Sequence, residues 1–264
     1  MKGRHTMFDK NLTATLNLPE PRSAQLRANW PAPAHVRTLI TTRTGGVSEG
    51  AFASLNVGAH VGDRPEHVAQ NRAIVQAHIP LPLAYLNQVH GNTVVRAADS
   101  LNAPADADAA VDDTGSAACA VMTADCLPVL FCDRAGTVVA AAHAGWRGLA
   151  DGVLANTVAA MKVAPMEIMA WLGPAIGAEA FEVGQDVWDA FCQADRKAQD
   201  AFRAIGGGKY LADICLLARQ ALYREGVTQI FGGGHCTVLE RERFYSYRRD
   251  RQTGRMVSAI WLER

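Results

Sequence analysis

The chain has 264 residues, of which 49% are hydrophobic and 20% charged, and its 26 lysines and arginines equal its 26 aspartates and glutamates in number. This composition is typical of a compact globular protein and excludes a disordered or fibrous one. The zero net charge provides no broad basic surface, so we expect neither nucleic acid nor a membrane as a partner.

No apolar run reaches the roughly 18 residues of a membrane span, and the first thirty residues do not form a signal-peptide pattern. A cytoplasmic location is therefore expected. The six cysteines are scattered through a chain too long to need disulfide stapling, and a reducing compartment would keep them as thiols.

The first elements indicate one domain preceded by a short lead-in. Residues 1–34 are polar and weakly patterned, so we predict an N-terminal lead-in there and a single catalytic domain over residues 35–264. A β-branched run at 35–43 predicts a strand, and the Gly- and Ser-rich stretch 44–56 predicts a long loop. Pro65 and apolar residues at helical spacing predict a helix over 64–79.

Short strands and amphipathic helices follow. Strand pairs are predicted around His90 and around Cys126, and a further strand ends at His143. Helices are expected over 149–162, around 184–195 and over 211–226, and strands within 167–177, 229–238, 243–250 and 256–262; Gly206 to Gly208 indicate a hinge or loop. Paired strands together with alternating strands and helices predict one α+β domain.

Three residues with metal-binding side chains share one sequence context. His90, Cys126 and His143 each lie where an apolar strand stops, in a turn that contains Gly or Pro. Two imidazoles and a thiolate suit zinc and leave a fourth tetrahedral position for water or substrate. Taken singly, each histidine is equally typical of a hydrogen-bonding turn residue, and Cys126 of a small buried hydrophobe.

A second chemistry uses the same side chains without a metal. Cys126 would be a nucleophile, His143 its base, and Asp125 or another acid would orient that base. The two hypotheses exclude each other for the thiolate, and metal content separates them.

Several polar residues are candidates for substrate contacts. Arg147, in the same turn as His143, is a candidate for binding an anion, and the alternative is a surface arginine lying over Trp146. The other candidates are loop residues and an arginine next to aromatic side chains that a purine could stack on: Arg43, Ser48, Asn56 and Arg248. Four acidic residues lack EF-hand spacing and are interpreted as a solvated loop or strand edge: Asp106, Asp108, Asp112 and Asp113.

Taken together, seven motifs resemble those of the YfiH family, the laccase-domain proteins once labelled multicopper polyphenol oxidases. They are NQVHG, DADA, TADCLPVLF, AAAHAGWRG, LGPAIG, FEVG and FYSYRRDRQTGR, in the expected order over about residues 35–262.

The resemblance implies a layered α/β sandwich with mixed sheets, similar to bacterial toxin cysteine deamidases. It also implies one metal site made of His90, Cys126 and His143, holding zinc, with copper as the alternative metal. The implied activity is phosphorolysis of purine nucleosides (adenosine, inosine, guanosine and methylthioadenosine), together with adenosine deamination. Purine nucleosides and phosphate are therefore the expected ligands, and no oligomeric state is indicated.

Two other activities stay open at this point. One is a cysteine-type amidase that edits peptidoglycan precursors, as proposed for some relatives. The other is a copper polyphenol oxidase, which the residues fit poorly because eight histidines and one constellation leave little for a multicopper cluster. For deamination, no Glu lies next to the three metal-binding candidates, so Asp125 is the nearest proton-transfer residue.

Overall fold

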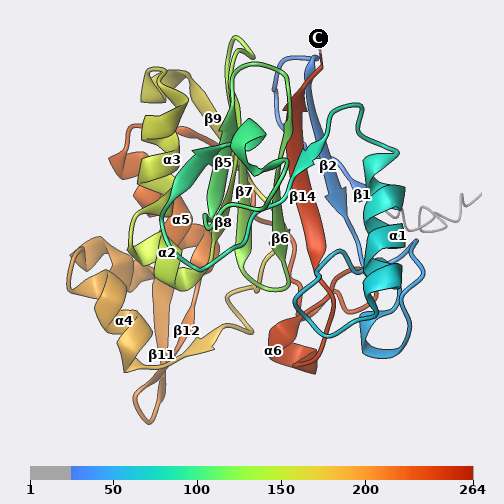
Figure 1. Cartoon of the computed structure of the whole chain (residues 1–264). Helices are drawn as coiled ribbons and strands as arrows, with labels where there is room; N and C mark the ends of the chain where they lie inside the picture. Colours follow the sequence, from blue (N-terminus) through green and yellow to red (C-terminus); the bar gives the residue numbers. More distant parts are fainter. Residues whose placement is uncertain (1–24, 264) are drawn as a thin grey trace, which may run out of the picture.

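The computed structural model describes residues 25–263, which form two β-sheets packed face to face with helices on both outer sides (Figure 1). The first sheet has the order β1, β2, β14, β6, β3, with bounds Gln25–Leu26, Val36–Thr41, Met256–Leu262, Ala118–Thr123 and Leu83–Ala84. The second has the order β13, β9, β7, β8, β5, β4, with bounds Gln229–Gly232, Ile168–Leu172, Leu127–Asp133, Val139–Ala144, Ala109–Asp112 and Val94–Arg96. Both sheets are mixed, because β3 pairs with β6, β13 with β9, and β4 with β5 in parallel.

The strand sequences explain why the two sheets stack. Side chains along a strand alternate between its faces, and in β7 both sets are apolar. Val129 and Phe131 pack toward the helices, while Leu130 and Cys132 pack toward the first sheet. A strand buried on both faces reads as a continuous apolar run rather than an alternating one, as the sequence here does.

Helices cover the two outer faces. Helix α1 (Pro65–Gln76) packs Val75 against the first sheet, with Leu39 and Trp261 in the same cluster. The second sheet is covered by α2 (Trp146–Ala150), α3 (Val153–Met161), α4 (Gln185–Cys192) and α5 (Ile214–Arg224). The result is a four-layer sandwich, which confirms the predicted α+β class and layered architecture.

A small third sheet lies beside α4. It has the order β10, β12, β11, with bounds Glu182–Val183, Lys209–Ala212 and Phe202–Gly206. Gly206, Gly207 and Gly208 all have positive φ; Gly206 ends β11 and pairs with Lys209, and Gly207 and Gly208 form the turn to β12. The predicted hinge or loop at these glycines is therefore a hairpin turn, a conformation that glycine adopts without steric cost.

Two expected elements differ from the structure. The helix expected over 149–162 is two helices, interrupted where Gly152 adopts a φ of 88° between α2 and α3. The strand expected within 243–250 is wrong: Tyr247–Asp250 forms the one-turn helix α6, and the Ser246 hydroxyl accepts a hydrogen bond from the Arg249 backbone N–H. A cap of this kind stabilises a helix start, and the alternating aromatic pattern does not reveal it.

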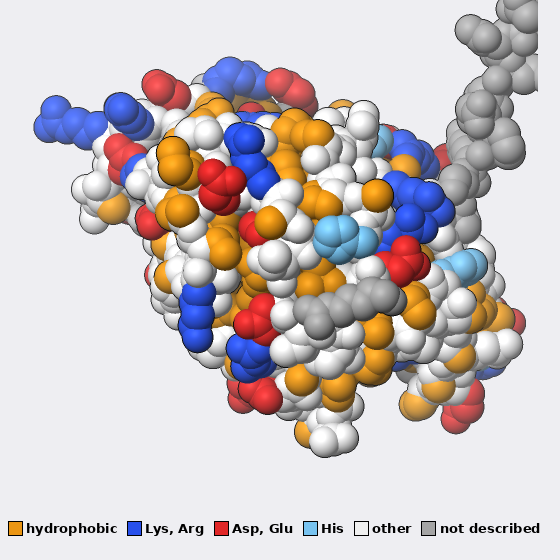
Figure 2. Space-filling view, turned by 90° about the horizontal axis from the view of Figure 1, so that it is seen from above, with side chains coloured by type: hydrophobic (Ala, Val, Ile, Leu, Met, Phe, Trp, Pro, Cys, Tyr) orange, Lys and Arg blue, Asp and Glu red, His pale blue; other side chains and the backbone are white. Residues whose placement is uncertain are grey.

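The remaining regular segments are four 3-10 turns, Gly50–Phe52, Ala97–Ser100, Pro165–Glu167 and Arg196–Ala201. Of the predicted lead-in 1–34, Gln25–Leu26 pairs with β2 at the edge of the first sheet, and residues 1–24 lie outside the described residues. Within residues 25–263 no helix is both long and apolar enough to cross a bilayer. Basic and acidic side chains are intermingled on the face shown in Figure 2, in keeping with the zero net charge.

Candidate metal centre

Three different segments bring the predicted metal ligands together. His90 lies in the loop between β3 and β4, Cys126 in the turn where the chain passes from the first sheet to the second, and His143 near the end of β8. Their ligand atoms all lie within 4.8 Å of one another, and these are the only such cluster of three or more among residues 25–263. We call these residues the metal triad.

The triad fits a tetrahedral metal. The Cys126 Sγ lies 4.0 Å from the His90 Nε2, and the two imidazoles meet edge to face with centroids 4.8 Å apart. A tetrahedral metal bound about 2.0–2.3 Å from each ligand atom needs the Cys126 Sγ and the His90 Nε2 only slightly closer together than their 4.0 Å. Two imidazoles and one thiolate are borderline-soft donors suited to zinc or copper, and they leave one position for water or substrate.

Backbone geometry at the triad explains the two glycines of the HAGWRG turn. A Cβ at Gly145 would lie 3.0 Å from the His90 Cδ2 and 3.3 Å from the Cys126 Sγ. A Cβ at Gly148 would lie 2.4 Å from the Gly91 carbonyl oxygen. Gly148 therefore needs a residue without a side chain where α2 meets the His90 loop, and a Cβ at Gly145 would press on two of the triad side chains.

A buried carboxylate, Asp108, fixes two of the three ligands. Its side chain accepts hydrogen bonds from the backbone N–H groups of Val89 (3.2 Å), His90 (3.0 Å) and Gly91 (2.7 Å). It also lies 2.7 Å from the His143 Nδ1, which assigns the proton to that nitrogen and leaves the Nε2 for the metal. These bonds hold His90 at a φ of 62°, an uncommon conformation for a residue with a Cβ.

Asp108 corrects the interpretation of the acidic cluster. Asp106 and Asp113 are exposed as expected, but Asp108 is fully buried and Asp112 nearly so. The signal in the sequence is the small apolar residue on each side of Asp108, which is typical of a strand entering the core.

The electrostatics of the metal-free site favour a thiolate beside an imidazolium. Burial alone would raise the pKa of Cys126, but the charges and hydrogen bonds of His143 and His90 lower it to about 6. Burial opposes the charge on His143 as well, yet Cys126 and Asp108 raise its pKa to about 9. A thiolate at neutral pH is both a metal ligand and a nucleophile.

Asp125 has a different role from the one its sequence position indicates. Its carboxylate accepts hydrogen bonds from the Thr237 hydroxyl and from the Arg248 backbone N–H, both at 2.6 Å. The residue is 8% exposed and has a φ of 102°. Asp125 therefore ties the Cys126 turn to the C-terminal segment, while Asp108 is the acid that orients His143.

Two pockets border the triad and share His90, Ala124, Cys126 and Tyr247, and His143 lines only the first of them. The first, of about 350 Å³, also contains His60 and Arg255, and we call it the His60 compartment. The second, of about 280 Å³, has apolar walls and three arginines, and we call it the arginine compartment. Helices α2 and α6, which contribute to the arginine compartment, both lie toward the lower end of the sheets in Figure 1.

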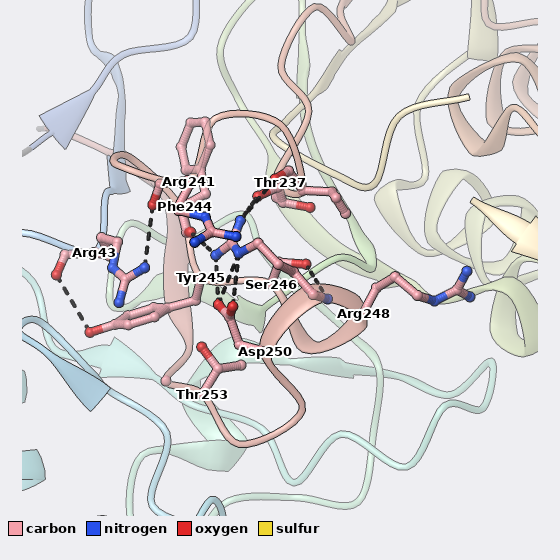
Figure 3. Close-up of polar contacts among 12 residues, drawn as sticks. Arg43, Thr237, Arg241, Phe244, Tyr245, Ser246, Arg248, Asp250 and Thr253 are labelled. Atoms are coloured by element: carbon pink, nitrogen blue, oxygen red, sulfur yellow. Dashed lines mark hydrogen bonds and ion pairs between the residues drawn. The ribbon is translucent and has the colours of Figure 1, made fainter. Parts of the chain in front are cut away.

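The arginine compartment contains two of the predicted anion contacts, Arg147 and Arg248, together with Arg251, which the sequence did not single out. Each guanidinium lies over an aromatic ring: Arg147 over Trp146, Arg248 over Phe181 and Arg251 over Tyr247. None of the three forms an ion pair with a carboxylate of residues 25–263. The Arg248 side chain extends away from the polar contacts drawn in Figure 3, and its Nη1 donates to the backbone carbonyls of Glu182 (2.8 Å) and Ala180 (3.5 Å).

The structure does not bring the other three predicted contacts into either pocket. The Arg43 guanidinium donates to the carbonyls of Ala53 and Arg241 and lies over the Tyr245 ring (Figure 3). The Ser48 hydroxyl and the Asn56 amide both donate to Asp63. All three side chains hold loops together.

Comparisons with known proteins identify the family of this chain. Residues 37–263 match the family model described as multi-copper polyphenol oxidoreductase laccase. The chain is 55% identical over 235 residues to a protein of Escherichia coli named purine nucleoside phosphorylase YfiH, covering 88% of this chain and 96% of the relative. It is 52% identical over 242 residues to a purine nucleoside phosphorylase of Pseudomonas aeruginosa, covering 91% and 99%. A crystal structure of a Neisseria meningitidis protein superposes with a TM-score of 0.91 and is 67% identical, covering 92% and 100%.

Proposed function

We propose that this chain, which belongs to the family described as multi-copper polyphenol oxidoreductase laccase and is similar to a protein named purine nucleoside phosphorylase YfiH, is a zinc-dependent purine nucleoside phosphorylase that also deaminates adenosine. The observation that supports this most directly is the convergence of His90, Cys126 and His143 in a pocket, in a chain whose relatives are named purine nucleoside phosphorylases. The proposed substrates are adenosine, inosine, guanosine and methylthioadenosine with phosphate, and the proposed location is the cytoplasm.

Phosphorolysis replaces the bond between C1′ and the purine N9 with a bond between C1′ and a phosphate oxygen. The transition state has oxocarbenium character, so the site must hold an anion next to the ribose and stabilise the departing base. In our proposal Arg147 and Arg248 bind phosphate, since both face the arginine compartment without a carboxylate partner among the described residues. Arg43, Ser48 and Asn56 line neither pocket, so we assign them no contact with substrate.

The metal would be held by the metal triad, with Asp108 fixing the His143 ring. When bound, zinc supplies Lewis-acid activation of water, the chemistry that adenosine deamination requires. The protein's own contribution is to keep Cys126 ionised and His143 oriented, and to line the arginine compartment beside them with the rings of Trp146, Phe181 and Tyr247. Copper is the alternative metal for the same donor set, but one three-residue site among residues 25–263 offers no basis for a multicopper oxidase.

One experiment tests the proposed function and separates its two activities. The zinc-loaded protein is incubated with adenosine, with and without phosphate, and the products are identified by mass. Adenine or hypoxanthine together with ribose 1-phosphate, formed only with phosphate, is expected, and inosine formed without phosphate indicates deamination. Cys126→Ala should lose tight zinc binding and both activities while remaining folded, and full activity of this variant without zinc would refute the proposal.

A second candidate function is a cysteine hydrolase that acts on amides, such as those of peptidoglycan precursors. The observation that favours it is a series of interacting side chains: the Cys126 thiolate lies beside His143, which could act as its base, and Asp108 orients the His143 ring. Metal-free protein should then be labelled at Cys126 by a thiol-directed electrophile and lose amide cleavage in proportion to the labelling. Cleavage that requires zinc would exclude this function.

A further inference from the structure

The His60 compartment contains two polar side chains that the mechanism above does not use. His60 comes from the loop between β2 and α1, and Arg255 from the residue just before β14. Both line a space of about 350 Å³ that borders the metal triad and adjoins the arginine compartment, with Tyr247 in the lining of both. This space is large enough for a purine base.

Both side chains present unused hydrogen-bonding atoms. The Arg255 Nη1 donates to the carbonyls of Thr253 (3.1 Å) and Gly254 (3.0 Å), whereas its Nε and Nη2 have no acceptor among residues 25–263. The His60 ring likewise has no hydrogen-bond partner within the described part of the chain. A half-buried guanidinium with free donors is poised to bind an acceptor that the protein does not supply.

A network of buried polar side chains holds these two residues in place. Asn56 accepts hydrogen bonds from the backbone N–H groups of Gly58 (2.9 Å) and Arg255 (2.8 Å), and donates to Asp63 at 2.9 Å. Asn56 thus joins both ends of the loop that contains His60 to the segment that contains Arg255. A Cβ at Gly58 would lie 2.7 Å from the Arg255 Cγ, so this glycine makes room for the arginine stem.

The surroundings of His60 lower its pKa. The residue is exposed on the solvent side, but the partial burial of its ring lowers the pKa first, and the charges of Arg255, Arg72 and His90 lower it further. A lowered pKa makes the protonated ring a stronger acid, so an imidazolium formed with a proton from solvent can pass that proton to a leaving base and be protonated again afterwards.

We propose that the His60 compartment holds the purine as it leaves, that His60 is the catalytic acid that protonates it, and that Arg255 stabilises its developing negative charge. The inference rests on the proposed phosphorolysis. Phosphate held by the arginines and a purine held by His60 and Arg255 would occupy two adjoining pockets that share His90, Cys126 and Tyr247, so a ribose bound between them would place C1′ between the nucleophile and the leaving group.

Atoms and charges balance in this phosphorolysis step. The C1′–N9 bond breaks and its electron pair goes to the purine, while a phosphate oxygen forms the new bond to C1′. HPO₄²⁻ loses its proton to solvent as it becomes the ester, and His60 gives one proton to the purine and regains one from solvent. The products are ribose 1-phosphate and the neutral purine, with no oxidant or further reactant needed.

The test compares two substrates that differ only in what their leaving group needs. Inosine must gain a proton to leave, whereas 7-methylinosine has a cationic base that leaves as a neutral purine without one. A general acid contributes roughly 10²- to 10⁴-fold, so His60→Gln should lower kcat for inosine by about 100-fold or more and leave kcat for 7-methylinosine within about threefold of wild type. The matched control is His78→Gln, because His78 is an exposed histidine outside both compartments.

Each other outcome is decisive. An equal loss with both substrates would show that His60 only supports the fold of the pocket, and unchanged inosine turnover would show that it has no part in the reaction; either overturns the inference. If the wild-type protein cleaves neither nucleoside in the presence of phosphate, the proposed function itself fails.

Discussion

The Asp108 carboxylate offers the sharpest test of the metal centre, because one side chain positions two of the three ligands. Asp108→Asn keeps the size of the side chain but removes its charge and replaces one acceptor oxygen with a donor NH₂. That NH₂ would face backbone N–H groups or the Nδ1–H of His143, which now donate to the carboxylate at 2.7–3.2 Å. Hence either the His90 loop or the His143 ring loses its partner.

Asp108→Asn should weaken both zinc binding and the stability of the fold. Loss of an outer hydrogen-bonding partner of a metal ligand typically costs 10- to 100-fold in metal affinity, so zinc binding should weaken by that factor, or about 1.4–2.7 kcal/mol. Hydrogen bonds to charged groups contribute about 1.5–3 kcal/mol each, and Asn retains part of them. The metal-free variant should therefore lose about 3 kcal/mol of unfolding free energy at pH 7.

The pH dependence has a definite sign. Burial raises the pKa of Asp108, but hydrogen bonds from His143 and the backbone outweigh it and hold that pKa below its usual value of 3.8. The ionised carboxylate thus stabilises the fold above that pH, and the contribution disappears as the pH falls through the folded-state pKa. The stability difference between the wild type and Asp108→Asn should accordingly shrink at acid pH.

Zinc affinity is measured by competition with a chromophoric chelator, and stability by urea unfolding of metal-free protein at pH 7 and near pH 3. Asp106→Asn is the matched control, because Asp106 is two residues away, exposed, and bonded to the Asn87 side chain rather than to a metal ligand. Zinc affinity of Asp108→Asn within twofold of the wild type would refute the role assigned to this residue.

Three further predictions concern other parts of the site. In metal-free protein, alkylation of Cys126 by iodoacetamide should rise with a midpoint near pH 6, while Cys215, whose pKa burial raises to about 12, should stay unreactive at neutral pH; a Cys126 midpoint near 9 would contradict the proposed ion pair. Gly145→Ala should lower zinc affinity at least tenfold with little change in the fold, since the new Cβ crowds His90 and Cys126, and calorimetric titration with zinc would measure this. Arg147→Met should raise the KM for phosphate about tenfold and leave zinc content unchanged, because it removes one charge-assisted contact of about 1.5 kcal/mol; an unchanged phosphate KM would make Arg147 a surface residue.

The fold was predictable where the chain repeats a simple physical pattern. Continuous apolar runs indicated the buried strands, including β7 and β8, and helical spacing indicated α5. The one-turn helix α6 was missed because its stability comes from the Ser246 cap and from the hydrogen bond between Asp125 and the Arg248 backbone, a contact 123 residues away in sequence. No local pattern contains such a contact.

The sequence by itself determined the chemistry of the metal site, since the residue types of His90, Cys126 and His143 fix which metals and which reactions they suit. Only the tertiary structure decided the geometry around them. It buried Asp108 beneath the His90 loop, tied Asp125 to the C-terminal segment, and placed His60 and Arg255 together across one pocket. The reason is physical: donor chemistry belongs to single side chains, whereas burial, shared hydrogen bonds and pKa shifts arise only when distant segments pack against one another.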